Sequence, residues 1–168
     1  MFQRAVVVVL AFLANAVAFG GLAAALRATL DQSRRSSAVW SLLGVASDGM
    51  VLSAAFPTDV LLSGAPITPI GTIHAIAALS KFACLAAGAV LSVRTLHLDG
   101  RRPELLRPLG VLAYGGAAAL VAFVGASVSG LPVAGLAQRI VTVLLLGWVV
   151  VAAGWVARTA TAPVTGAS

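Results

Sequence analysis

Two ionisable side chains interrupt apolar segments that otherwise carry almost no charge. Asp48 lies in the segment Ala38–Phe56 and Lys81 in the segment Ile70–Val93. If both segments are helices, Asp48 is about 12 Å below the end of its segment and Lys81 about 16 Å below the start of its own. Because these depths are similar, we predict that the carboxylate and the ammonium meet as a buried ion pair. The alternative is a proton-handling Asp48 adjusted by Lys81.

A second group of polar side chains falls at the ends of three segments. Asp59 follows one apolar segment, His74 lies about one turn inside the next, and Arg139 opens the last. Successive spans alternate in direction, so we expect all three residues at the same membrane face. An acid, an imidazole and a guanidinium there would orient one another or bind an anionic head group. His74 and Lys81 are two helical turns apart, which predicts that they share one helix face.

The same residues also fit structural roles. Asp59 would cap the next helix, and His74 would be a satisfied histidine at the interface. Arg139 stands near the start of a predicted helix, where the macrodipole disfavours a cation, so a carboxylate or phosphate partner is expected. The single cysteine, Cys84, belongs to no cluster with zinc-ligand spacing. We therefore predict neither a metal nor another cofactor.

Five apolar segments must position these side chains. The chain of 168 residues is 60% hydrophobic and 10% charged, with a mean hydropathy of +1.04. Each segment is close to the ~20 residues that a membrane-spanning helix needs, and recurring Gly and Ala favour close helix packing. The sequence predicts an all-α, multi-pass transmembrane bundle as one domain over 1–158, followed by a disordered tail over 159–168. The segments are Ala5–Leu26, Ala38–Phe56, Ile70–Val93, Leu109–Val128 and Ile140–Ala157.

The arginines predict the orientation of this bundle. If the spans alternate, one side carries Arg27, Arg34, Arg35, Arg94, Arg101, Arg102, Arg107 and Arg158. The other side carries only Arg4 and Arg139, so the positive-inside rule places the N-terminus outside and the C-terminus in the cytoplasm. The rival interpretation is a cleaved signal peptide over Met1–Ala18, which this charge bias disfavours. Although the pI is about 11.4, no basic stripe interleaved with aromatic residues indicates nucleic-acid binding.

Three stretches resemble the bacterial integral membrane family called domain of unknown function 998. They are FPTD at 56–59, TPIGTIHAIAALSKF at 68–82 and GLAQRIVTVLLLGW at 135–148, within a resemblance that covers about Ala5 to Arg158. The resemblance implies a six-helix protein of the bacterial inner membrane, whose first helix this five-span chain would lack. It supplies site candidates but no reaction, and Asp48 and Lys81 are outside its pattern. The matching positions are Gly71, His74, Phe82, Gly135, Leu136, Arg139 and Trp148.

Several functions remain open. No G-x-S-x-G or H-E-x-x-H motif is present, which favours a non-enzymatic accessory or lipid-binding protein. Its expected partners are membrane lipid, a second copy or another membrane protein, whose complex it would stabilise. A small-solute permease is a further possibility, although five short helices leave little room for alternating access.

The alternative from another class is an intramembrane enzyme acting on a lipid or isoprenoid. A protonated Asp48 would serve as general acid toward an alkene or epoxide. Otherwise Asp59 with His74 would activate water beside a phosphate bound to Arg139. An enzyme should show a closed pocket that converges on one of these sets, whereas a scaffold should leave the residues satisfied in pairs.

Overall fold

Five α-helices account for nearly all of the part of the chain that the computed structural model describes, residues 2–30, 33–56, 58, 68–98 and 103–160. All five are long and apolar enough to cross a membrane, and no strand occurs in these residues. The predicted all-α bundle with five spans is therefore confirmed. The helices are α1 (Phe2–Thr29), α2 (Arg34–Ala55), α3 (Pro69–Leu98), α4 (Pro103–Val128) and α5 (Ala134–Ala160).

Each helix is longer than the apolar segment that predicted it. At the start of α2, the Ser33 side-chain oxygen accepts a hydrogen bond from the backbone N–H of Ser36 at 3.2 Å, so the helix begins in polar sequence. Pro103 begins α4, where its missing N–H costs nothing. Helix α5 continues to Ala160, past the predicted start of the tail, and the rest of that tail is outside the described residues.

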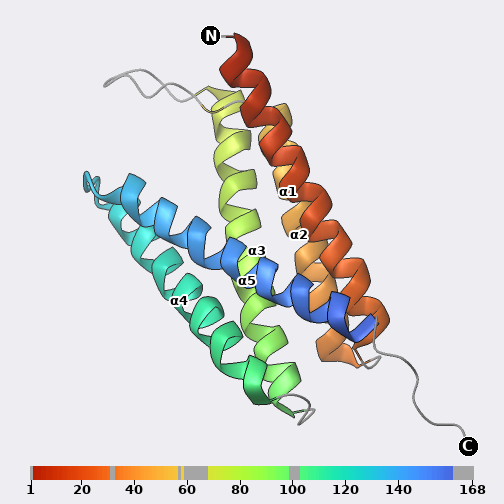
Figure 1. Ribbon diagram of the computed structural model, residues 1–168. Helices are drawn as coiled ribbons and strands as arrows, with labels where there is room; N and C mark the ends of the chain where they lie inside the picture. The colour runs from red at the N-terminus through yellow and green to blue at the C-terminus, as the bar shows by residue number, and fades with distance from the viewer. Residues whose placement is uncertain (1, 31–32, 57, 59–67, 99–102, 161–168) are drawn as a thin grey trace, which may run out of the picture.

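The helices run alternately up and down, so their connections gather at two ends of the bundle (Figure 1). The arginine-rich end holds the end of α1, the start of α2, the end of α3, the start of α4 and the end of α5. The opposite end holds Phe56, His74 and Arg139. Arg101 and Arg102 are outside the described residues. The arginines described at the arginine-rich end are Arg27, Arg34, Arg35, Arg94, Arg107 and Arg158.

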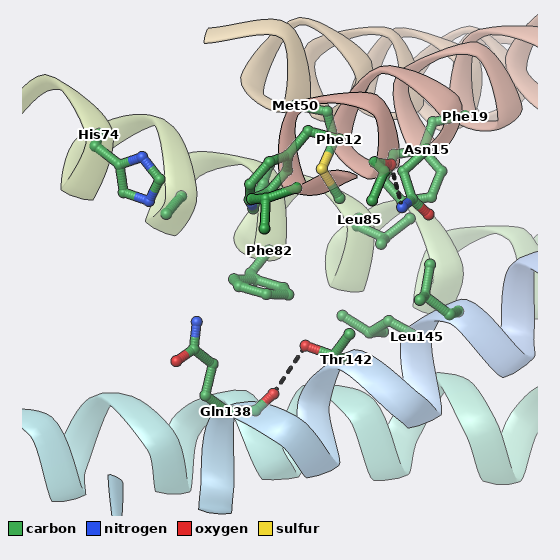
Figure 2. A pocket seen from close by; sticks show the side chains of 15 residues that line it. Phe12, Asn15, Phe19, Met50, His74, Phe82, Leu85, Gln138, Thr142 and Leu145 are labelled. Atoms are coloured by element: carbon green, nitrogen blue, oxygen red, sulfur yellow. Dashed lines mark hydrogen bonds between the residues drawn. The ribbon is translucent and has the colours of Figure 1, made fainter. Parts of the chain in front are cut away.

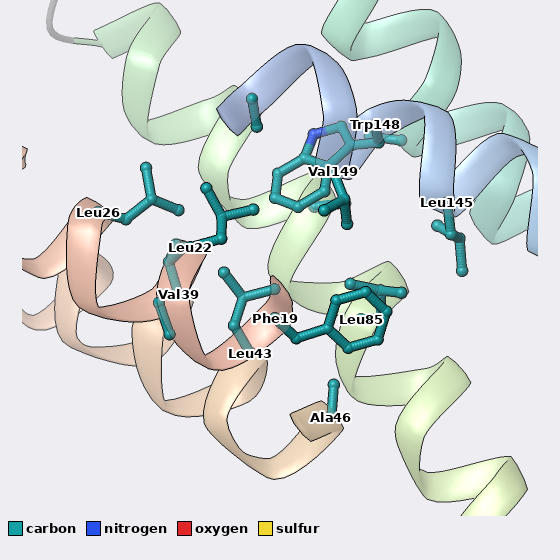
Figure 3. Close-up of a cluster of buried hydrophobic side chains, with 14 of the residues drawn as sticks. Phe19, Leu22, Leu26, Val39, Leu43, Ala46, Leu85, Leu145, Trp148 and Val149 are labelled. Carbon is teal, nitrogen blue, oxygen red and sulfur yellow. The ribbon is translucent and has the colours of Figure 1, made fainter. Parts of the chain in front are cut away.

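Two groups of helices make up the bundle. Helix α2 packs against α1 and α3, while α4 packs against α5 and α3. Helix α5 crosses in front of α3 in Figure 1 and contacts α1 and α3 through few residues. Between described residues, α4 contacts neither α1 nor α2. All five helices contribute to the core, and Figure 3 shows four of its fully buried members, Phe19, Leu43, Leu145 and Trp148.

Small residues set the closest helix contacts. A Cβ added to Gly49 of α2 would lie 2.8 Å from the Lys81 Cβ and 3.1 Å from the Ala77 carbonyl oxygen, both on α3. Between α2 and α1, the Ser47 hydroxyl donates a hydrogen bond to the Ala16 carbonyl at 2.8 Å. Small side chains let helix backbones approach closely where lipid supplies no hydrophobic drive. The Gly49 contact fixes the position of Lys81 beside α2.

A glycine turn makes α4 and α5 a hairpin. Gly130 has a φ of 65°, in the left-handed region that glycine adopts without penalty. Its N–H donates to the Ser127 carbonyl at 3.2 Å, and the Leu131 N–H donates to the Ala126 carbonyl at 2.9 Å. This pair of bonds is the Schellman motif that ends many helices. It satisfies the last carbonyls of α4 and turns the chain toward α5.

Candidate functional site

A cavity of about 290 Å³ lies between α1, α3 and α5, and Met50 of α2 also lines it (Figure 2). We call it the Lys81 cavity. In Figure 2, Phe12, Asn15 and Phe19 of α1 face Gln138, Thr142 and Leu145 of α5, with Phe82 of α3 between them. Most of the lining is apolar. The polar lining residues are Asn15, His74, Lys81, Gln138 and Thr142.

Among the described residues that line this cavity, Lys81 is the one charged residue, and it is only 4% exposed. Its Nζ lies 3.4 Å from the Ser53 hydroxyl, which itself donates to the Gly49 carbonyl at 2.8 Å. The Nζ also lies 4.5 Å from the centre of the Phe12 ring and 5.3 Å from that of Phe82. Aromatic faces attract a cation, but an ammonium has three N–H donors. N–H donors of the Lys81 ammonium therefore remain for hydrogen bonds to a ligand.

The predicted ion pair between Asp48 and Lys81 is wrong. Asp48 is exposed on the outer face of α2 and does not line the cavity, and no ion pair joins these two described residues. Its neighbour Gly49 is the residue that faces Lys81. Successive side chains on a helix point about 100° apart. Asp48 therefore has a depth similar to that of Lys81, but its side chain points in another direction. The proposed adjustment of Asp48 by Lys81 loses its geometric basis.

His74 is held by the end of α2. Its Nδ1 lies 2.7 Å from the Phe56 carbonyl oxygen. A carbonyl only accepts hydrogen bonds, so Nδ1 carries the proton, and Nε2 of a neutral ring is left as an acceptor. The ring also meets the Phe12 ring edge-on, with centroids 6.4 Å apart. Since His74 and Lys81 both line the Lys81 cavity, their predicted common helix face is confirmed.

Of the predicted cluster of Asp59, His74 and Arg139, the structure does not place Arg139 in a cavity with His74. Asp59 lies outside the described residues, so its role stays a prediction. Arg139 is exposed at the start of α5 and lines neither the Lys81 cavity nor the adjoining hollow of about 350 Å³ that also reaches His74. Gln138 lines both. The structure thus brings His74 together with Gln138 rather than with Arg139.

Several polar members of this site were not predicted from the sequence. The Thr142 hydroxyl donates to the Gln138 carbonyl at 2.9 Å, and the Asn15 amide donates to the Ala11 carbonyl at 2.8 Å. The spacing of Gln138 and Thr142, four residues apart in an apolar helix, was a signal for one polar face. Asn15, isolated among apolar residues of α1, was another. Ser53 carried no such signal, because its role depends on the packing of α2 against α3.

The site is cationic in character. It offers the Lys81 ammonium and the Gln138 amide as donors, and none of the described residues that line it is acidic. Within the described ranges, no three His, Cys, Asp or Glu side chains come together as metal ligands. Cys84 is half-buried and does not line the cavity. Such a site can hold an anionic group against an apolar wall.

Comparison with known proteins gives a family. The model of the family described as "Protein of unknown function (DUF998)" matches residues 3–155. The chain matches no curated protein and no solved structure. The matched range includes every residue that lines the Lys81 cavity. The chain belongs to the protein family of unknown function DUF998.

Proposed function

We propose that this multi-pass membrane protein binds an anionic amphiphile in the Lys81 cavity, with a carboxylate or phosphate at the Lys81 ammonium. The observation that carries the proposal is a buried ammonium, bordering a cavity, whose described contacts are one hydroxyl and two aromatic rings. Burying a charge without an opposite charge is costly. An anionic ligand would supply that opposite charge.

The surroundings of Lys81 support an amphiphile over a small ion. Phe12, Phe82 and Leu85 provide apolar walls for a hydrocarbon chain. The Nζ reaches Ser53, which lies two residues before the end of α2. The ammonium therefore extends toward the end of the bundle that is opposite to the arginine-rich end. His74 and Gln138 lie on the same side and offer further hydrogen bonds to a head group. The polar part of the ligand would therefore lie nearer to the membrane surface than its chain.

The matched test uses two single substitutions in a neutral detergent. Lys81→Met removes the buried charge, while Arg139→Met removes an exposed charge at the same end of the bundle. We expect Lys81→Met to weaken binding of laurate or dodecyl phosphate at least tenfold, about 1.4 kcal/mol. Binding of the uncharged dodecanol should be unaffected. Native mass spectrometry of the protein titrated with each compound measures these affinities.

The arms of this experiment separate the possible ligands. A preference for dodecyl phosphate over laurate would indicate a phospholipid-like ligand, and the reverse preference a fatty acid. Unchanged affinity of the Lys81→Met protein for both compounds would contradict the proposal. So would an equal loss in the Arg139→Met protein, because the effect would then be one of net charge.

We further infer that the protein lies in a bacterial cell membrane with its arginine-rich end in the cytoplasm. Six described arginines gather at that end, against Arg4 and Arg139 near the other, which is the asymmetry of the positive-inside rule. The N-terminus and His74 would then be outside.

Two exposed leucines at opposite ends test this orientation. Leu136 is 60% exposed and Leu98 is 62% exposed. In a Cys84→Ala background, we expect Leu136→Cys to react with an impermeant maleimide on intact cells. Leu98→Cys should react only after the cells are permeabilised. The reversed pattern would place the arginine-rich end outside.

An enzyme that acts on the bound lipid is the second candidate. It is supported by His74, whose Nδ1 contact with Phe56 leaves Nε2 of the neutral ring as a hydrogen-bond acceptor, and hence a base, in a residue that lines the cavity. Asp48 takes no part in this candidate, since it lies on the outer face of α2. Incubation with membrane lipid extract followed by mass spectrometry distinguishes the two: an enzyme changes the lipid and loses that activity in His74→Gln, whereas a binding protein returns the lipid intact.

A further inference from the structure

A second cavity, of about 540 Å³, lies at the arginine-rich end between α2, α3 and α4. We call it the arginine cavity. Arg35 reaches it from α2, Arg94 and His97 from α3, and Tyr114 from α4. None of these residues lines the Lys81 cavity. The rest of its lining is apolar and consists of Leu91, Val93, Leu98 and Leu106.

A smaller hollow continues from the arginine cavity. It measures about 330 Å³, and Arg35 and Leu98 line both spaces. Thr95 of α3 also lines it, and so do Arg34 and the helix cap Ser33 at the first turn of α2. The positive end of a helix of 22 residues adds to the two guanidinium groups there. Among the described residues that line these two spaces, the charged side chains are all arginines.

The arginines of this region are available to a ligand. Arg35 and Arg94 are exposed, and neither forms an ion pair with a described residue. Among the residues that the structure describes, no acidic side chain contributes to the lining of either space. A guanidinium binds phosphate oxygens in a bidentate manner. Two such groups from different helices on one cavity therefore favour a phosphate.

The position of the cavity favours a lipid phosphate. Arg94 follows Val93, the last residue of the predicted apolar segment, and therefore lies at the level of lipid head groups. Below it, Leu91, Leu106 and Tyr114 form a wall suited to an acyl chain. Topology alone requires only that arginines occur at this end. It does not require them to converge from α2 and α3 on one hollow with an apolar floor.

We propose that the arginine cavity binds a phospholipid of net negative charge, with its phosphate between Arg35 and Arg94 and an acyl chain along Leu91, Leu106 and Tyr114. This site is separate from the Lys81 cavity and lies at the other end of the bundle. The proposal therefore does not depend on the proposed function above.

The test compares two double variants that lose the same charge. Arg35→Gln/Arg94→Gln removes both guanidinium groups of the cavity. Arg107→Gln/Arg139→Gln removes two exposed arginines that do not line it. The proteins are placed in nanodiscs of phosphatidylcholine with added phosphatidylglycerol. We expect the preference of the first variant for phosphatidylglycerol over phosphatidylcholine to be at least tenfold lower than that of the native protein. The second variant should retain the preference, as measured by native mass spectrometry of the lipids that remain bound.

Further arms decide the result. Arg35→Lys/Arg94→Lys should bind phosphatidylglycerol better than the glutamine pair but more weakly than the native protein, because an ammonium lacks the bidentate geometry. Equal losses in both glutamine pairs would overturn the proposal, as would soluble glycerol phosphate binding as tightly as the lipid. Matching melting temperatures of the two glutamine pairs would show that both proteins are folded.

Discussion

Replacing Trp148 with alanine is expected to lower the free energy of unfolding by about 3 kcal/mol, at the lower end of the range for a core tryptophan. Trp148 is 1% exposed and belongs to the buried hydrophobic cluster to which all five helices contribute. In a membrane, the loss is mainly one of packing, because lipid is as apolar as the core. Titration of the folded protein in mild detergent with dodecyl sulfate, followed by near-ultraviolet circular dichroism, measures the difference.

Two variants of the same helix serve as controls. The Trp148 Nε1 is buried and has no hydrogen-bond partner among the described residues, so Trp148→Phe should remove no hydrogen bond and lose much less stability. Val150 is 71% exposed, and Val150→Ala should change stability by less than about 0.5 kcal/mol. A loss in Trp148→Ala no larger than that in Val150→Ala would mean that the cluster does not stabilise the bundle.

Gly49→Ala is expected to cost about 2 kcal/mol. The added methyl group would lie 2.8 Å from the Lys81 Cβ and 3.1 Å from the Ala77 carbonyl oxygen, and neither atom is the mobile end of a side chain. Overpacking of this kind costs up to about 3 kcal/mol, and the better helix propensity of alanine returns about 1 kcal/mol. The steric term should prevail. The same dodecyl sulfate titration measures it.

Gly44 on the same helix provides the matched control for Gly49. A Cβ added to Gly44 would meet nothing within 4 Å, so Gly44→Ala should be neutral or stabilise the protein. An intermediate result is expected for Gly116→Ala, since its nearest neighbour is the Leu145 Cδ2 at the flexible end of a side chain. Equal stabilities of the Gly49→Ala and Gly44→Ala proteins would show that α2 and α3 are less closely packed than described.

The fold could be predicted because hydropathy and helix length respond to the same constraint, the thickness of a membrane. All five apolar segments are helices, and the described arginines other than Arg4 and Arg139 lie at one end of the bundle. The helix ends were predicted too short. Hydrogen bonding continues through polar residues such as Ser33 and Ser36, where hydropathy has already fallen.

The site could be predicted within one helix but not between helices. His74 and Lys81 share a face because the helical period fixes their relation. The direction of Asp48 relative to Lys81 depends on how α2 is rotated against α3, which the close contact at Gly49 determines. The prediction was likewise wrong by one residue in α5, where Gln138 lines the site instead of Arg139. Depth follows from counting residues along a helix, whereas contacts between helices require the packing itself.

The hairpin of α4 and α5 has a consequence for ligand size. It meets the other helices chiefly through α3, and its α5 forms one side of the Lys81 cavity. A change in the tilt of this hairpin would widen or narrow the space beside Lys81 while every backbone hydrogen bond within the helices stays intact. Hydrocarbon chains of different girth and saturation would then be accommodated by sliding side-chain contacts alone. We therefore expect the Lys81 cavity to accept ligands with different hydrocarbon tails and to discriminate between ligands by their head groups.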